Sequence, residues 1–290
     1  MNVLLLPAAL SPKSKKNDAG CLRSWERFCV ERSLPVLPTT LEALRVYLTD
    51  MPARVTAGTL RHVVGSVRRW HLESGLGDPA DEAFFEELRR AQRRCRVPEL
   101  IPCLTHDLAL VVDRMPNTPA GMRDKLLLLL IYAVRISAPA AAKLNRSDVR
   151  IEPRGMVLNV RYGRRTKEMT LRRHHDARYC PVSAMEHYLE LFRDDDEAAL
   201  IRVCHIGRLT QKRLSLRRTA TAMRFRFRAA GLALPAMISL RAGMLVVATN
   251  RGADEYAIMR QQGYSRETTV RNLQSRLRLN EVDAVDKLRL

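Results

Sequence analysis

Two arginines stand in apolar stretches of the chain, where a solvated charge is out of place. Arg135 directly follows the run LLLLLIYAV (126–134), and Arg241 lies in ISLRAG (238–243) with apolar residues on both sides. Arginine is seldom buried without a partner, so these positions favour a charge that is held in place for a function. Because the planar guanidinium donates paired hydrogen bonds to phosphate, phosphate binding is the first chemistry to consider.

The charge of the whole chain points the same way. Its 290 residues carry 50 Lys and Arg against 31 Asp and Glu, which gives a net charge of +19. Such an excess favours a polyanionic partner, with double-stranded DNA or RNA as the first choice. An acidic membrane surface is the weaker rival, because the sequence has no basic amphipathic helix and no lipidation signal. We therefore expect no membrane partner.

The positive charge is concentrated in three segments. Residues 202–228 carry nine Lys and Arg and no acidic residue, residues 161–178 carry seven, and residues 55–71 form a basic helix. Solvated faces usually mix both signs, so one-sided runs are better explained by phosphate contacts that weaken steeply with salt. Basic faces in two domains suggest a clamp around a duplex. The candidate DNA-binding residues are Arg61, Arg68, Arg69, Arg164, Arg165, Lys212, Arg213, Arg217 and Arg218.

Hydrophobic spacing and turn residues divide the chain into two domains. Residues 1–18 read as a disordered basic tail, and residues 19–96 as a small all-helical domain of four helices. A linker with two prolines, 97–106, leads to a second domain, 107–290. There, apolar alternation around YGRRTK in residues 155–173 predicts two or three short strands, and the pattern is helical again from Cys180 onward.

The sequence gives no sign of a bound metal or other cofactor. The six cysteines form no C-x-x-C pair, and His174, His175 and Cys180 lack the usual ligand spacing. The longest apolar run has nine residues, too short to cross a bilayer, and predicts a buried helix. With no signal peptide, we expect a reduced intracellular compartment. That would be the nucleus in a eukaryote, and the cytoplasm or nucleoid otherwise.

Five segments, in the same order along the chain, resemble those of the tyrosine recombinases, also called the phage-integrase family. GMRDKLLLLLIYAVRISAPAAAKLNRSDV resembles the segment G-x-R-D-x-x-L-L-L-L that leads to R-x-S-E, and AGLALPAMISLRAG resembles the H-x-L-R-x-G box. The resemblance covers roughly residues 20 to 280. The remaining three segments are GTLRHVVGSVRRWHLESGLGDP, RYCPVSAMEHYL and GADEYAIMRQQGYSRETTVRNL.

This resemblance implies both a fold and a chemistry. The fold is mainly α with a small β-sheet or hairpin, and joins an N-terminal helical core-binding (SAM-like) domain to a tyrosine-recombinase catalytic domain. In the family, a tyrosine attacks a DNA phosphate, and the 5′ hydroxyl of another strand reverses the step. Cations stabilise the charge that builds on the transferring phosphate, and a histidine moves a proton.

Carried over to this chain, the resemblance assigns four catalytic positions. Arg135 and Arg241 are the two phosphate-binding arginines. Lys167 is the hairpin lysine that protonates the leaving oxygen, with Arg165 as the fallback. Tyr264 occupies the position of a second histidine or tryptophan, where its hydroxyl could still donate a hydrogen bond.

Three family positions depart from the pattern. The acidic residue after the first arginine is Ala138, and the histidine before the second arginine is Ile238, which cannot carry a proton. The nucleophile position falls on Leu273, or on Asn272 if the spacing slips by one, and no tyrosine follows Tyr264. Neither residue can form a phosphoryl intermediate, and no activating base lies near the remaining hydroxyls, Ser265 and Ser275.

The resulting hypothesis is a DNA-binding protein of tyrosine-recombinase type, of mobile-element origin, that is unable to form the phosphotyrosine intermediate. A working recombinase with an unorthodox nucleophile is one alternative, and a non-catalytic scaffold for nucleic acid, RNA included, is another. Residues 268–290 form an amphipathic helix by their pattern. That helix packs either on its own domain or on a second copy of the chain bound to the same DNA.

Overall fold

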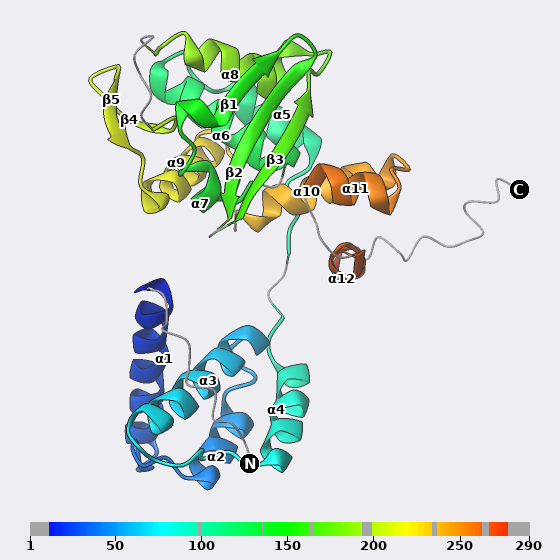
Figure 1. Ribbon diagram of the computed structural model, residues 1–290. Helices are drawn as coiled ribbons and strands as arrows, with labels where there is room; N and C mark the ends of the chain where they lie inside the picture. The colour runs from blue at the N-terminus through cyan, green and yellow to red at the C-terminus, as the bar shows by residue number, and fades with distance from the viewer. Residues whose placement is uncertain are drawn as a thin grey trace, which may run out of the picture. The chain divides into compact units, whose positions relative to one another are not determined.

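The computed structural model describes residues 12–97, 100–134, 136–162, 165–192, 199–233, 237–262 and 267–277, with no side chains for 12–16, 261, 262 and 276. The chain divides into two compact units, Met1–Glu99 and Leu100–Leu290 (Figure 1). This division falls inside the linker expected at 97–106, because residues 100–106 belong with the second unit.

The first unit is a four-helix domain, as the hydrophobic spacing predicted. Threonine and aspartate side chains cap three of its helices, with Thr40, Thr56 and Asp81 each accepting a hydrogen bond from a first-turn amide. Its core is built around Trp25, Tyr47 and Phe84, all fully buried. The helices are α1 (Pro12–Glu31), α2 (Leu41–Asp50), α3 (Ala57–Glu73) and α4 (Glu82–Arg94).

The expected disordered tail at 1–18 needs a correction at its end. Helix α1 already begins at Pro12, so residues 12–18 are helical, while 1–11 lie outside the described residues. Asp18 explains part of the difference. It accepts a hydrogen bond from Ser66 at 2.8 Å and forms an ion pair with Arg69, so the start of α1 is fastened to α3. Neither contact is visible from local sequence, because Asp18 and Arg69 are 51 positions apart.

The second unit is mainly helical, with two small antiparallel sheets. Helix α6 lies at its centre, and Leu126 to Ile131 are all buried, which confirms the buried helix expected for that apolar run. The elements before α9 are α5 (Thr105–Asp113), α6 (Pro119–Val134), α7 (Ala138–Ala141), η1 (Arg146–Asp148), β1 (Val149–Glu152), β2 (Gly155–Tyr162), β3 (Arg165–Arg172), η2 (Ala177–Tyr179), α8 (Pro181–Leu189), β4 (Arg202–His205) and β5 (Arg208–Arg213). They are followed by α9 (Leu216–Ala229), α10 (Ile238–Asn250), α11 (Glu255–Gln262) and α12 (Glu267–Arg276).

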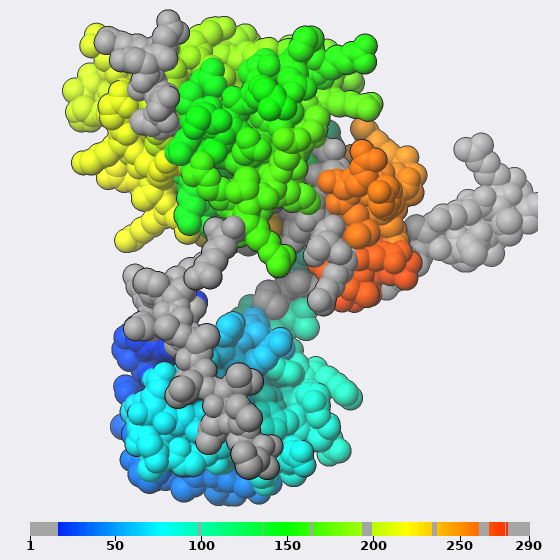
Figure 2. Space-filling model, in the orientation of Figure 1, coloured from blue at the N-terminus to red at the C-terminus, as the bar shows by residue number. Residues whose placement is uncertain are grey.

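The larger sheet has the strand order β1-β2-β3. Strands β2 and β3 lie in the segment 155–173 where strands were predicted around YGRRTK, whereas β1 precedes that segment. Strand β2 pairs with β3 from Gly155 opposite Arg172 to Tyr162 opposite Arg165. The buried side chains Met169 and Leu171 alternate with exposed ones, so one face of β3 covers the core. In Figure 2 this sheet forms the visible green surface of the second unit, with α10 to α12 (orange) beside it.

The expectation of purely helical structure after Cys180 is wrong for residues 202–213. They form the hairpin β4–β5, which turns at Ile206 and Gly207 with φ values of 46° and 71°. A two-residue turn with two positive φ angles matches the twist of a hairpin. The hairpin is hard to recognise in the sequence because most of its side chains are partly or fully exposed, so no clean apolar alternation appears.

Candidate functional site

Helix α10 carries Arg241 and is held by an unusually close backbone contact. A Cβ added at Gly243 would lie 1.5 Å from the carbonyl oxygen of Cys103, so only glycine fits there. The amide of Cys103 also donates to the carbonyl of Ser239 at 2.9 Å. These contacts fasten the first turns of α10 to the segment before α5. They fix the position of this part of α10, and with it the backbone of Arg241. That residue is partly buried and lies one turn after the helix begins.

Lys167 lies on β3 opposite Val160 and is exposed. Side chains two apart along a strand point to the same face, so Lys167 and Arg165 share the face of buried Met169 and Leu171. Both cations therefore lie on the face of β3 that covers the core, but nearer to the turn between β2 and β3, where the side chains are exposed. Either of them can present a charge on that side of the sheet.

Two of the four predicted catalytic residues, Arg135 and Tyr264, lie outside the described residues. Their neighbours are described in part. Val134 and Ile136, on either side of the first arginine, are 1% and 0% exposed. Ala138, where the family has an acidic residue, is 7% exposed and begins α7.

The positions that the resemblance assigns to the histidine and the nucleophile, Ile238 and Leu273, carry apolar side chains in different settings. Ile238 is the first residue of α10 and is 37% exposed, one turn before Arg241. Leu273 on α12 is partly buried and packs against the cluster of Leu245, Ile258 and Val270. Its neighbour Asn272 is exposed, and so is Ser275. Position 273 thus contributes to the packing of α12 onto α10 and α11.

The arginines predicted to bind DNA on α3 differ in their surroundings. Arg61 is exposed. Arg68 donates through two nitrogens to Asp78, with its guanidinium 4.5 Å from the ring centre of Phe85. Arg69 is paired with Asp18. Two of the three charges are therefore already matched by carboxylates within the first unit.

The predicted residues of the second unit also fall into two groups. Lys212, Arg217 and Arg218 are exposed, while Arg164 lies outside the described residues. Arg213 instead donates to the carbonyl oxygens of Ala142 and Leu144 at 2.8 and 2.9 Å. Burial of its guanidinium lowers the pKa of Arg213 below the ordinary arginine value. Its position indicates that it fastens β5 to the loop after α7.

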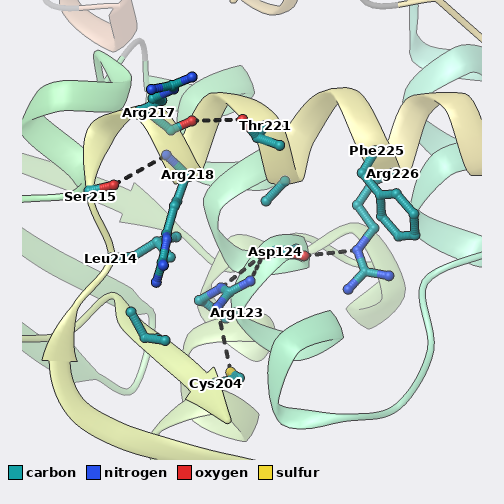
Figure 3. A pocket seen from close by; sticks show the side chains of 12 residues that line it. Arg123, Asp124, Cys204, Leu214, Ser215, Arg217, Arg218, Thr221, Phe225 and Arg226 are labelled. Atoms are coloured by element: carbon teal, nitrogen blue, oxygen red, sulfur yellow. Dashed lines mark hydrogen bonds and ion pairs between the residues drawn. The ribbon is translucent and has the colours of Figure 1, made fainter.

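Sequence reasoning missed a buried charge network at the start of α6. Arg123 and Asp124, 7% and 2% exposed, form an ion pair at 2.7 Å. Arg226 of α9 donates to the other oxygen of Asp124 at 2.8 Å (Figure 3). Arg123 also donates to the backbone carbonyl of Arg202. The sequence signal was the R-D of the G-x-R-D segment, but the partner Arg226 is 102 positions away.

This network forms the floor of a pocket of about 640 Å³ between α9, the β4–β5 hairpin and the start of α6. Arg217, Arg218 and Phe225 of α9 also line the pocket (Figure 3).

The sequence analysis also missed a group of cations in the first unit, on α4 and just after it. The exposed members of this group, in the run RRAQRRCR, are Arg89, Arg90, Arg93, Arg94 and Arg96. Of these, Arg89 pairs with Glu86.

Nothing in the described structure points to a metal or membrane function. Within those residues, no group of three or more His, Cys, Asp or Glu side chains could hold a metal ion. All six cysteines fall in the described part of the chain and are free thiols. Among the described helices, none is both long and apolar enough to span a membrane.

Comparison with known proteins finds a similarity in sequence to an integrase/recombinase homologue and a similarity in fold to DNA-bound integrases. No family model matches the chain. In sequence it is 22% identical over 263 residues to an integrase/recombinase XerD homologue of Selenomonas ruminantium, covering 85% of this chain and 77% of that protein. In structure it resembles a lambda integrase dimer bound to a COC′ core site, with a TM-score of 0.62, 12% identity and coverage of 92% and 90% of the two chains.

A transposon enzyme gives a similar match. The Tn1549 transposon integrase in complex with transposon right end DNA has a TM-score of 0.61 and 14% identity, covering 95% of each chain. The expected fold, a mainly helical chain with small antiparallel sheets and two domains, is confirmed. The chain is therefore similar in its two-domain fold to these integrases, and in sequence to the XerD homologue.

Proposed function

We propose that this chain binds double-stranded DNA as a site-specific recombination protein of mobile-element origin, and that it does not form the phosphotyrosine intermediate. The claim that no phosphotyrosine intermediate forms depends on the identity and packing of Leu273. The resemblance assigns the nucleophile position to Leu273, or to Asn272 if the spacing slips by one, and Leu273 packs against Leu245, Ile258 and Val270. A side chain with no hydroxyl cannot become a phosphoryl carrier. No tyrosine follows Tyr264 that could take over.

Binding without cleavage is chemically consistent with the residues that the chain keeps. Arg241 and Lys167 are cations, and arginine holds phosphate through paired hydrogen bonds whether or not a strand is cut. Loss of the proton-carrying histidine at Ile238 would by itself cost about 10²–10⁴-fold in rate. The proposal therefore assigns the remaining cations, with Arg135, Arg217 and Arg218, to DNA binding rather than to catalysis.

A covalent-capture assay on nicked duplexes tests the proposal. A nick beside the attacked phosphate lets a short fragment diffuse away, so a covalent protein–DNA adduct would accumulate. Because the DNA site is unknown, candidate element ends and a pool with random flanks would both be used. We expect salt-sensitive gel shifts and no adduct on a denaturing gel.

Three variants make the result decisive. If wild-type protein forms an adduct that disappears in Tyr264→Phe, Ser265→Ala or Ser275→Ala, the chain is a working recombinase with an unorthodox nucleophile and the proposal is wrong. Equal or better binding of RNA than of duplex DNA would favour the scaffold alternative. Sizing the shifted complexes would also test whether a second copy binds through the C-terminal helix, as the resemblance implies.

A further inference from the structure

The pocket beside α9 is large enough for a ligand and has a defined shape. Its volume of about 640 Å³ lies within the range of roughly 300–1,000 Å³ that small-molecule sites usually have. Buried Arg123 and Asp124 form its floor together with Cys204, while the exposed side of α9 forms one wall (Figure 3). Lys167 and Arg241, the two assigned catalytic positions within the described residues, are not among the residues that line it.

The lining of the pocket is strongly positive. Four arginines contribute to it, and Asp124 is the one carboxylate among the lining residues. That carboxylate is already engaged, because one oxygen accepts from Arg123 and the other from Arg226. The net formal charge of four arginines and one aspartate is +3, so the pocket favours an anionic ligand.

Arg226 offers hydrogen-bond donors to such a ligand. Its side chain is 13% exposed, and its Nε donates to Asp124 at 2.8 Å. In Figure 3 the two terminal nitrogens lie at the end of the side chain beyond Nε, and no dashed line joins either of them to Asp124. Within the described part of the chain, these two nitrogens have no hydrogen-bond partner. A fork of this kind pairs with the acceptor atoms on the edge of a nucleobase.

Phe225 supplies an aromatic surface next to that fork. Its side chain is 60% exposed, and the Arg226 guanidinium lies 5.5 Å from its ring centre. Aromatic rings beside arginines bind unpaired bases, because every base has a π-face and an edge with acceptors. A base within a duplex is stacked and paired, so it cannot enter a pocket without leaving the stack.

The geometry points to a binding site for one unpaired nucleotide, with the base on Phe225, its edge facing Arg226 and the phosphate near Arg218. Arg218 lies two turns before Arg226 on α9, roughly 12 Å along the helix axis. The inference rests on the proposed function in one respect, that this unit binds nucleic acid. Unpaired nucleotides occur in DNA and RNA alike, and both share the chemistry that the pocket recognises.

The test compares paired and unpaired probes on the full-length chain. Fluorescence anisotropy would measure binding of a blunt duplex, the same duplex with a one-nucleotide bulge, and the matching single strands of DNA and RNA. A bulge of 2-aminopurine would report stacking through quenching of its fluorescence. We expect Phe225→Ala to weaken binding of bulged and single-stranded probes by about five- to one-hundred-fold. Affinity for the blunt duplex should stay within about twofold.

A matched control exists in the same unit. Tyr256 is 69% exposed with Arg260 6.0 Å from its ring centre, yet it is not among the residues that line the pocket. Tyr256→Ala should therefore leave the preference for unpaired probes intact, and Phe225→Trp should preserve the quenching. Equal losses on blunt and bulged probes would overturn the inference, and so would competition by polyglutamate as effective as that by single-stranded DNA. Failure to bind any nucleic acid at low salt would instead overturn the proposed function.

Discussion

Helices α3 and α9 are the two arginine-rich helices singled out from the sequence, but their charges have different surroundings. On α3, Arg68 and Arg69 are paired with Asp78 and Asp18, which the fold brings from outside the helix. On α9, the described residues include no ion-pair partner for Arg217 or Arg218. The number of arginines is thus a poor measure of the charge available to DNA, because nearby carboxylates decide how much remains.

The largest expected effect concerns Arg226 of α9, which is paired with a carboxylate as Arg68 and Arg69 of α3 are. Arg226 shares Asp124 with Arg123, and the carboxylate is 2% exposed. Asp124→Asn would leave two nearly buried guanidinium groups without their counter-charge. We expect this change to reduce the free energy of unfolding by about 3–5 kcal/mol, as measured by urea denaturation of the full chain.

The control for this experiment is an ion pair of the same chemistry at the surface of the same unit. Glu186 pairs with Arg173 at 2.6 Å, but both side chains are about one-third exposed, at 34% and 38%. Glu186→Gln should therefore cost far less, because exposed pairs are screened by water. Equal losses in the free energy of unfolding for Asp124→Asn and Glu186→Gln would show that burial does not increase the contribution of the Asp124 network to stability.

The next effect tests directly whether α9 supplies free charge and α3 does not. The double variant Arg217→Ala/Arg218→Ala should flatten the dependence of log K for duplex DNA on log salt by about two units, at roughly 0.9 for each phosphate that is no longer neutralised. The double variant Arg68→Ala/Arg69→Ala should change the slope much less. Anisotropy titrations between about 50 and 200 mM salt measure both. A larger change for the α3 pair would reverse the comparison.

The parts of the fold that follow from local patterns could be predicted from the sequence. The buried α6, the strands β2 and β3 around YGRRTK and the capping threonine of α2 each depend on residues close together in the chain. The pairing of Arg69 with Asp18 spans 51 positions, and that of Arg226 with Asp124 spans 102. Such pairs depend on the assembled core, so the sequence reveals the charges but not whether they are matched.

For the candidate site too, the sequence identifies residues but not their surroundings in the fold. The resemblance identified Lys167 and Leu273 as family positions, but not which way their side chains face. The pleat of β3 places Lys167 on the core-covering face, and the packing of α12 places Leu273 against Val270 and Ile258. The pocket beside α9 was not foreseen, since the β4–β5 hairpin that borders it has no clear strand pattern. The roles assigned to all of these positions stay predictions, and Arg135 and Tyr264 also lie outside the described residues.

The smallest expected effect concerns the Arg68–Asp78 pair and its dependence on pH. The hydrogen bonds from Arg68 hold the pKa of the Asp78 carboxyl below its ordinary value of 3.8. A carboxyl whose pKa is lower in the folded state stabilises the fold above the unfolded pKa, and this contribution is lost as pH falls through the folded pKa. The wild-type chain should therefore exceed Arg68→Ala in stability at about pH 5, by up to ~1 kcal/mol for a surface pair.

That stability difference should shrink as pH falls below about 4, where Asp78 begins to be protonated in the unfolded chain, and the ion-pair contribution is lost as pH falls through the lower folded pKa. It should not vanish, because Arg68 also lies 4.5 Å from the ring centre of Phe85, a contact that no proton removes. Urea denaturation of both proteins at about pH 5 and about pH 3 separates the two contributions. A difference that stays constant across this range would mean that the arginine acts only through the ring. In that case Asp78 would not neutralise Arg68, and α3 would keep charge for DNA as α9 does.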